Sequence, residues 1–375
     1  MSPAPRHVGL NALFFEPDRS AGTETYLRGL VPAMARASPD TRLTVVTTRK
    51  GAAALVADGW TDFASVVQLA SDEGQRARRM LSEQVRYPVL GRRRGWDLLH
   101  SLASVAPVRT ATPSVITVHD ATFFRMATFN LVTTLGMRAI VRAAARRADG
   151  LIAVSEAGRR DVAEALGIPP ERFEVVFNGA GRRPGGDAEA ADALRARHGI
   201  AADARVVLCV AALRPHKNQA LLVRALGSLP RDVVVVLAGH PEAYADELVA
   251  LAADLGVADR LRVAGYVSDR ELEGLYRLAA CAALPTLAEG FGLPVLEALR
   301  RELPLACSDL AVLHEVGGDA PHYFDPRDPA GAARAIVAAI DAGPAPGARA
   351  QAERFTWEAA AEGTLAAYER ALAGT

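Results

Sequence analysis

Two glutamates, Glu289 and Glu297, stand eight positions apart and enclose the triplet Gly290-Phe291-Gly292. An apolar run at 281–284 predicts a strand before them, and Pro294 is typical of the start of a helix. The glycines allow the backbone to approach a ligand closely, and a helix N-terminus presents unpaired N–H groups to an anion. We therefore predict an anion site with a carboxylate on each side, Glu297 being on the first turn of the helix. Such a site suits a ligand that carries phosphate between two hydroxyl-bearing sugars.

A pair of cations, Arg214 and Lys217, follows another strand-like run farther upstream. Residues 206–213 are apolar and rich in β-branched side chains, which indicates a buried parallel strand, and Asn218 is predicted to cap the next helix. Ligands bind at the carboxyl ends of strands in open α/β sheets, and a guanidinium with an ammonium suits a diphosphate. Only 2 of the 43 basic residues are lysines, so a lysine at position 217 stands out.

Strand-like and helical patterns alternate along the whole chain, which predicts parallel sheets with helices on both faces. The strand-like runs lie at 7–15, 43–47, 66–69, 98–100, 115–119, 151–154, 175–177, 206–210, 233–238, 261–264, 281–284 and 305–307. Helical patterns lie between them, among others at 23–37, 131–147, 156–166, 221–229, 243–255, 269–278 and 295–301.

The length of 375 residues favours two domains, and the glycine-rich segment 179–186 is the natural linker between them. We predict Rossmann-like domains at 1–180 and 181–350. A C-terminal helix within 351–375 is expected to pack as a strap, back toward the first domain.

Composition and charge narrow the classes of function. The net charge is zero, which argues against nucleic-acid binding, but residues 1–183 hold 25 basic and 17 acidic residues, a net +8 that the rest balances with −8. This asymmetry indicates an anionic surface or partner for the first half. No apolar stretch is long enough to span a membrane, no signal-peptide pattern is present, and three cysteines without CxxC spacing fit buried thiols in a reducing cytoplasm. The eight histidines form no metal-binding motif.

These motifs, taken in order along the chain, resemble those of the family 4 glycosyltransferases. The matching features are Gly22 at the opening of the first long helix, Val118-His119-Asp120 after a strand, Ala153-Val154-Ser155-Glu156 at a helix start, Arg214-x-x-Lys217-Asn218, Glu289-x7-Glu297 and the closing Phe355-Thr356-Trp357-Glu358. The sequence departs from the family pattern at Ala21, at 301–304 and at His314. These departures weaken any inference about the preferred donor.

The resemblance implies a GT-B fold, in which two Rossmann-like domains face each other across a cleft. It implies transfer of a hexose, with mannose as one option, from a nucleoside diphosphate sugar to a hydroxyl group, with retention of configuration and without a metal ion or other cofactor. Arg214 and Lys217 would stabilise the departing diphosphate electrostatically. Glu289, with the N–H groups of Gly290, Phe291 and Gly292, would bind hydroxyls of the donor sugar. Glu297 would bind the ribose hydroxyls.

The resemblance assigns further residues to the donor and to the acceptor side. The backbone near Tyr266 and Val267 would meet the base, and the turn at Gly22 and Thr23 would close over the phosphates. His119 would touch the sugar and mark the acceptor side, with Asp120 and His100 as weaker candidates. GDP-mannose and a UDP-hexose are both open as donors, with a slight preference for GDP-mannose. The acceptor is a glycan, a lipid-linked sugar or a small molecule.

A basic segment, Arg76 to Arg94, interleaves arginines with apolar residues. Such a segment suits peripheral contact with an anionic membrane at its cytoplasmic face, or else it is a solvated face of an arginine-rich protein. Other hypotheses also stay open. They are a sugar-nucleotide epimerase, a phosphorylase, a non-catalytic nucleotide-sugar-binding protein, and covalent catalysis by Glu289.

Overall fold

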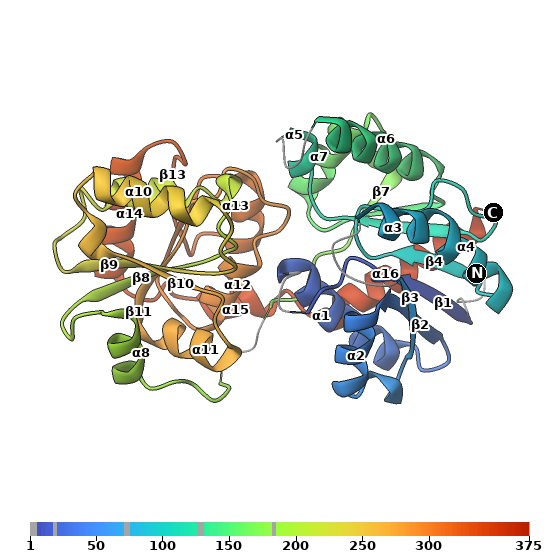
Figure 1. Cartoon of the computed structure of the whole chain (residues 1–375), viewed down its shortest axis with the longest axis horizontal. Coiled ribbons are helices and arrows are strands. Elements are labelled where there is room, and N and C mark those ends of the chain that lie inside the picture. The colour runs from blue at the N-terminus through green and yellow to red at the C-terminus, as the bar shows by residue number, and fades with distance from the viewer. Residues whose placement is uncertain (1–5, 18–20, 71–75, 126–130, 182–184, 375) are drawn as a thin grey trace. The chain divides into compact units, whose positions relative to one another are not determined.

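The structure is a computed structural model that describes residues 6–17, 21–70, 76–125, 131–181 and 185–374 (Figure 1). The chain divides into two compact units. Unit 1 comprises Met1–Gly179 and Phe355–Thr375, and unit 2 comprises Ala180–Arg354. Each unit is built on its own parallel sheet.

The sheet of unit 1 has seven strands in the order β3-β2-β1-β4-β5-β6-β7, and all its described pairs are parallel. Its strands are β1 (His7–Asn11), β2 (Arg42–Thr48), β3 (Ser65–Ala70), β4 (Leu98–Ser101), β5 (Ser114–Val118), β6 (Gly150–Ala153) and β7 (Phe173–Val175). The chain order runs in opposite directions on either side of the neighbours β1 and β4. Ligands bind outside the carboxyl ends of strands at such a switch point.

Helices α1 (Ala21–Ala37) and α16 (Trp357–Ala373) pack together in unit 1 although they lie at opposite ends of the chain. The Thr356 side chain caps α16 by accepting a hydrogen bond from the N–H of Ala359. Buried aromatic and aliphatic side chains of both helices join one core, so α16 is part of this unit. The other helices are α2 (Arg49–Ala57), α3 (Arg76–Leu81), α4 (Tyr87–Arg94), α5 (Thr122–Arg125), α6 (Leu131–Arg147) and α7 (Glu156–Leu166).

The sheet of unit 2 has six strands in the order β10-β9-β8-β11-β12-β13, again with all described pairs parallel. Its strands are β8 (Arg205–Val210), β9 (Val233–Ala238), β10 (Leu261–Gly265), β11 (Ala279–Leu284), β12 (Leu305–Ser308) and β13 (His322–Phe324). Strand β9 is buried along its whole length, which explains its uninterrupted apolar sequence.

Helices cover both faces of the second sheet, with α10 and α14 on one side and α8 and α11 on the other (Figure 1). The helices of this unit are α8 (Ala191–His198), α9 (Gln219–Ala225), α10 (Tyr244–Asp254), α11 (Asp269–Leu278), α12 (Leu293–Arg300), α13 (Ala311–Gly317), α14 (Pro329–Ala342) and α15 (Ala348–Glu353). The predicted alternation of strands and helices in parallel sheets is therefore confirmed in both units.

Several predicted bounds were wrong, among them those of the strand at 7–15, which ends at Asn11, and one strand was missed. The last strand of unit 1 is Phe173–Val175 rather than 175–177, and α9 ends at Ala225 rather than at 229. Strand β13 was missed because it is only 3 residues long and contains a histidine.

The three cysteines are buried in strands of unit 2. Cys209, Cys281 and Cys307 are buried free thiols, as predicted, and burial raises the pKa of Cys209 and of Cys281 to about 12. Within the described residues, no helix combines the length and the apolar character needed to cross a bilayer.

Candidate functional site

The loops that leave β8, β9, β10 and β11 meet at one edge of the second sheet. Strands β8 and β11 are neighbours, and the chain order runs in opposite directions from them, so this edge is the switch point of unit 2. The predicted residues Arg214, Lys217, Tyr266 and Glu289 lie on these loops. The fold therefore gathers these predicted residues, together with Val267 and the Gly290-Phe291-Gly292 triplet, at the place where open α/β sheets bind ligands.

Lys217 and Glu289 are in direct contact. The Nζ atom of Lys217 lies 2.7 Å from Oε2 of Glu289, and the two side chains are only 20% and 14% exposed. The backbone carbonyl of His216 accepts a hydrogen bond from the N–H of Leu287, so the loops after β8 and β11 are also tied through the main chain. This pair places one cation and one carboxylate at the mouth of the switch point.

Arg214 pairs with a residue that the sequence did not suggest. Its Nη2 and Nε atoms lie 2.6 and 2.8 Å from Oε1 of Glu242, which follows β9. Both side chains are about half exposed, so solvent screens the pair and leaves the guanidinium free to exchange partners. The position of Glu242 just beyond the carboxyl end of a strand was the only sequence signal for it.

Asn218 is the N-cap residue of α9, as predicted, but it does not cap the helix through its side chain. Asn218 adopts a left-handed conformation with φ of 56°, and its side chain makes no cap hydrogen bond. Its amide instead donates to the carbonyls of Pro285 and Pro326, each at 2.9 Å. Asn218 therefore joins three loops at the edge of the sheet.

The Gly-Phe-Gly triplet leads into α12, with Gly292 as the N-cap residue. Gly292 has φ of 99°, a conformation that favours glycine, and a Cβ there would lie 2.8 Å from Leu313. Pro294 occupies the first turn, as predicted, and Phe291 is buried.

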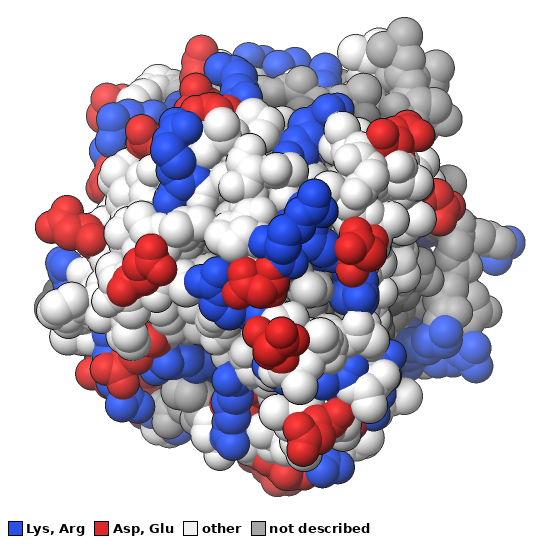
Figure 2. Space-filling view, turned by 90° about the vertical axis from the view of Figure 1, so that its left-hand side faces the viewer, with Lys and Arg blue, Asp and Glu red and all other residues white. Residues whose placement is uncertain are grey.

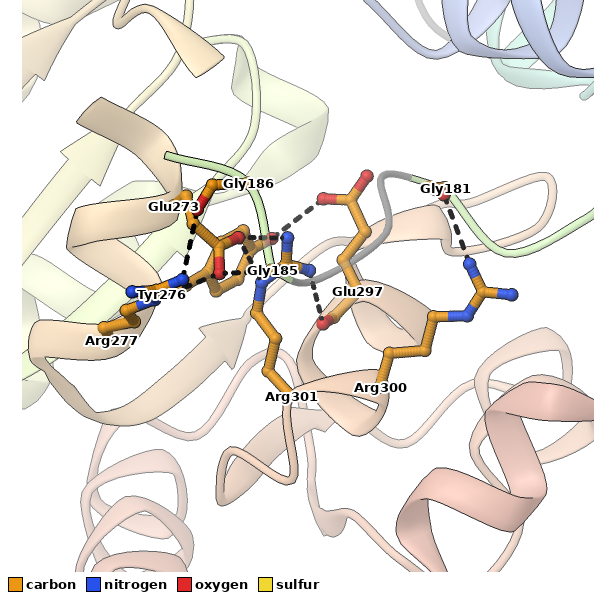
Figure 3. Close-up of polar contacts among 9 residues, drawn as sticks. All are labelled: Gly181, Gly185, Gly186, Glu273, Tyr276, Arg277, Glu297, Arg300 and Arg301. Carbon is orange, nitrogen blue, oxygen red and sulfur yellow. Dashed lines mark hydrogen bonds and ion pairs between the residues drawn. The ribbon is translucent and has the colours of Figure 1, made fainter. Parts of the chain in front are cut away.

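Glu297 lies on the second turn of α12 rather than on the first, and its side chain is buried. Figure 3 shows the carboxylate held by the hydroxyl of Tyr276, which donates to Oε2 at 2.9 Å. The backbone of Gly181 passes so close to Oε1 that a Cβ at that position would overlap it. The contact of Tyr276 with Glu297 was not predicted, because the position of Tyr276 in α11 has the pattern of any buried helical residue.

Tyr266 and Val267 follow β10 with opposite exposures. The Tyr266 ring is half exposed and its centroid lies 6.4 Å from that of His240, which follows β9. Val267 is buried. A half-exposed aromatic ring therefore follows the carboxyl end of β10.

Five predicted residues lie in unit 1, of which His119, Asp120, Gly22 and Thr23 are described first. His119 follows β5, and its Nε2 donates to the carbonyl of Leu102 at 2.8 Å. Burial lowers the pKa of His119, although the Leu102 hydrogen bond and Asp120 oppose this, so the ring is neutral and Nδ1 is a hydrogen-bond acceptor. Asp120 accepts a hydrogen bond from the N–H of Thr122 at 2.7 Å and thus caps the next turn. Gly22 and Thr23 lie in the first turn of α1, where Gly22 is exposed.

His100 is a core residue, and its candidacy as a site residue was wrong. Its ring is fully buried, with Nδ1 2.6 Å from the Tyr368 hydroxyl and Nε2 2.9 Å from Oγ1 of Thr117. Burial lowers the pKa of His100 to about 3, so the ring stays neutral. The residue ties β4 and β5 to α16 and presents no free ring nitrogen to a ligand.

The basic segment folds as α3, a π-helical turn at Ser82–Arg86, and α4. Leu81, Val85 and Val89 recur every four residues and are 59%, 49% and 45% exposed. They form one outward apolar stripe, and we name these three residues the stripe. Exposed arginines accompany it at positions 78, 86, 92, 93 and 94.

The face of unit 2 in Figure 2 differs from this segment. Basic and acidic side chains are interspersed over it and do not gather into a patch of one sign. In the described part of the chain, no group of three or more His, Cys, Asp or Glu side chains is placed to hold a metal ion.

Comparison with known proteins agrees with this architecture. The family model described as glycosyl transferases group 1 matches residues 191–354, and the one described as glycosyltransferase family 4 matches residues 20–180. Two relatives are D-inositol 3-phosphate glycosyltransferases. The one from Kineococcus radiotolerans is 32% identical over 74% of this chain and 67% of its own length. The one from Mycolicibacterium vanbaalenii is 31% identical over 74% and 68%.

Solved structures show the same fold. Anabaena Alr3699/HepE in complex with UDP and glucose superposes with a TM-score of 0.73 at 21% identity, covering 95% of this chain and 97% of its own. Sucrose-phosphate synthase from Thermosynechococcus elongatus superposes with a TM-score of 0.77 at 17% identity, covering 99% and 100%. The fold is that of the GT-B glycosyltransferases, and the chain belongs to the family 4 glycosyltransferases.

Proposed function

We propose that this enzyme transfers a hexose from a nucleoside diphosphate sugar to a hydroxyl group with retention of configuration and without a metal ion. The observation that carries the proposal is the contact between Lys217 and Glu289 beside the start of α12. A cation and a carboxylate at this edge can bind the two ends of one donor, its phosphates and its sugar hydroxyls.

The leaving group defines the role of the cations. When the glycosidic bond breaks, the bonding electrons stay with the diphosphate oxygen, and a preorganised positive charge lowers the energy of that step. Lys217 is the better placed of the two cations because it is largely shielded from water, where electrostatic stabilisation is strong. Arg214 would turn from Glu242 to the diphosphate when the donor binds, which its exposed position permits.

The carboxylates bind hydroxyls in this proposal. Glu289 accepts hydrogen bonds from the donor sugar, together with the N–H groups of Gly290, Phe291 and Gly292. Glu297 accepts them from the ribose, for which a carboxylate with two oxygens is suited. The backbone at Tyr266 and Val267 contacts the base.

Unit 1 supplies the acceptor side. His119 binds the transferred sugar or the acceptor through Nδ1, because its Nε2 proton is committed to Leu102. Gly22 and Thr23 contribute to phosphate binding from the first turn of α1, and Asp120 supports the turn that follows His119.

Several candidate donors and several candidate acceptors should be assayed. Alr3699/HepE was solved with UDP and with UDP-glucose, so UDP-hexoses stand beside GDP-mannose as donors. The relatives are named for D-inositol 3-phosphate, so a phosphorylated polyol stands beside glycans, lipid-linked sugars and small molecules as acceptors.

We also propose that the stripe and its arginines hold the enzyme at an anionic membrane surface on the cytoplasmic side. Three aligned apolar side chains that are about half exposed can insert at the headgroup boundary while the arginines bind acidic lipids.

A thermal-shift screen with UDP, GDP, ADP and TDP tests the nucleotide site, because a ligand that binds only the folded protein raises its Tm. Transfer is then assayed with the matching donor sugars, with and without EDTA. We expect a product that retains the anomeric configuration and an unchanged rate in EDTA. Donor epimerisation without transfer, or nucleotide binding without any turnover, would contradict the proposal.

A further inference from the structure

The hydroxyl of Tyr276 fixes one oxygen of Glu297. Tyr276 is buried on α11 and donates to Oε2 at 2.9 Å, across 21 positions of sequence (Figure 3). The hydrogen bond of a buried hydroxyl to a carboxylate is strong and directional because water does not compete for it. The plane of the carboxylate is therefore set by a residue outside the Glu-x7-Glu motif.

Arg301 holds the Tyr276 ring in place. Its guanidinium stacks over that ring with 4.4 Å between Cζ and the ring centroid. Its Nη2 and Nε atoms lie 2.6 and 3.0 Å from Oε2 of Glu273, and its Nη1 donates to the carbonyl of Glu297 at 2.9 Å. One arginine thus joins α11 to the end of α12 through both its planar face and its edge.

The Arg301–Glu273 pair is a buried ion pair. Both side chains are 8% exposed. Burial alone would raise the pKa of Glu273, but the hydrogen bond and charge of Arg301 outweigh it, so the pKa is lowered and the carboxylate stays ionised. Removing one partner of such a pair leaves an uncompensated buried charge, so the pair is a rigid support for the Tyr276 ring.

The segment that enters unit 2 closes the other side of Glu297. Gly181 lies against Oε1, where a Cβ would overlap the carboxylate. Arg300 donates to the carbonyls of Ala180 and Gly181 at 3.3 and 3.4 Å, which holds this backbone in place. Glu297 is thus confined by Tyr276 on one oxygen and by Gly181 beside the other.

We infer that Tyr276 is a positioning residue that aims the Glu297 carboxylate at the two ribose hydroxyls of the nucleotide. The inference rests on the proposed function, in which Glu297 binds the ribose. Its consequence is specific: the Tyr276 hydroxyl contributes to recognition of the 2′,3′-diol and does not contribute to binding of the base or the diphosphate.

The variant Tyr276→Phe removes the hydroxyl and keeps the ring under Arg301. Calorimetry with UDP, GDP and their 2′,3′-dideoxy analogues measures the contribution of the diol in wild type and variant. We expect the variant to bind the natural diphosphate about tenfold more weakly and the dideoxy analogue with unchanged affinity. The KM for the donor should rise by a similar factor, while kcat at saturating donor stays within about twofold.

Tyr244→Phe is the matched control, because Tyr244 is a half-buried tyrosine of the same unit that hydrogen-bonds to the backbone of Ala220. It should leave both affinities unchanged. Arg301→Lys provides a second variant, which loses the planar guanidinium over the Tyr276 ring and its paired contact to Oε2 of Glu273, and it should show the same selective loss for the diol.

Equal weakening of the natural and dideoxy nucleotides in Tyr276→Phe would overturn the inference, since a structural defect affects both alike. The inference would also be overturned if wild type prefers the natural nucleotide over the dideoxy analogue and Tyr276→Phe keeps the same preference. In that case the proposed function stands. A wild type that binds none of UDP, GDP, ADP and TDP contradicts the proposed function, and the inference falls with it.

Discussion

The ammonium of Lys217 and the carboxylate of Glu289 lie 2.7 Å apart across the central strands β8 and β11, 72 positions apart in sequence. The two opposite charges face each other in a place that is largely shielded from water. When a donor enters, its phosphate and its sugar hydroxyls can replace this contact without leaving either charge unpaired. In the proposed function, the pair therefore keeps the site preorganised before the donor arrives.

Two histidines at neighbouring strand ends should respond differently to substitution. His119→Ala removes the Nδ1 acceptor and should lower kcat by about 10²-fold or more while the affinity for nucleoside diphosphate in unit 2 is unchanged. His100→Gln breaks contacts within the core and should lower the Tm by several degrees with little effect on the kcat of the folded enzyme. Steady-state kinetics and thermal melts of both variants check this. Loss of activity with normal stability in His100→Gln would contradict the assignment.

Glu83 should make the stability of unit 1 depend on pH. Burial raises the pKa of Glu83 to about 7, although Arg79 and Asn11 oppose the shift. A carboxyl group whose folded pKa is raised contributes stability below its unfolded pKa of 4.5, and this contribution is lost as pH rises toward 7. Glu83→Gln removes the titration, so its Tm relative to wild type should be several degrees higher at pH 8 than at pH 5.

The difference between variant and wild type isolates Glu83, because His100 titrates in both proteins. The lowered pKa of His100 acts in the opposite direction and removes stability as pH falls below 6.5. Glu171→Gln, at an exposed glutamate, is the control and should give a constant Tm difference. Parallel pH profiles for Glu83→Gln and wild type would show that Glu83 is ionised throughout.

Glu302 occupies a strained backbone position. Its φ is 51°, a left-handed conformation that costs a residue with a Cβ about 1–2 kcal/mol. Its ion pair with Arg349 is long, at 3.9 Å, and exposed, so it contributes little. Glu302→Gly should therefore stabilise unit 2 by about 0.5–1 kcal/mol, after the greater flexibility of glycine in the unfolded chain is included. Thermal melts that compare the Tm of Glu302→Gly with that of Glu302→Ala, which keeps the Cβ, check this. Equal Tm values for the two variants would argue against strain at this position.

The stripe predicts salt-sensitive membrane binding. Wild type should co-sediment with vesicles that contain anionic lipid, and the double variant Val85→Glu/Val89→Glu should stay in the supernatant, because carboxylates cannot enter the headgroup boundary and are repelled by acidic lipids. Val249→Glu, at an exposed apolar residue of unit 2, is the matched control and should pellet like wild type. Failure of wild type to pellet with anionic vesicles would remove the membrane proposal.

The sequence predicted much of the fold because its strands are unambiguous. Runs such as Val233–Ala238 are apolar throughout and are separated by amphipathic segments. This pattern is typical of a parallel sheet with helices on both faces. Short elements escaped prediction, as β13 did, because 3 residues carry too little periodicity.

Site residues could be predicted only where they belong to a recognisable sequence motif. Lys217 and Glu289 were predicted, and the structure brings them together. The role of His100 was not predictable, because its partner Tyr368 is 268 positions away. The role of Asn218 was also not predictable, since its long-range contacts to two proline carbonyls replace the local cap. Tyr276, Glu273 and Arg301 were missed because ordinary helix patterns contain the same residue types.

The most direct test of the central claim is calorimetry of wild type and Lys217→Ala with UDP, GDP and the corresponding nucleosides, combined with kcat for transfer. The account predicts a loss of about 10²- to 10³-fold in kcat, an affinity for the diphosphate that is weaker by tenfold or more, and an unchanged affinity for the nucleoside. Lys50→Ala, at the only other lysine of the chain, should match wild type. A Lys217→Ala protein that binds the diphosphate as tightly as wild type and transfers sugar at the same rate would contradict the account.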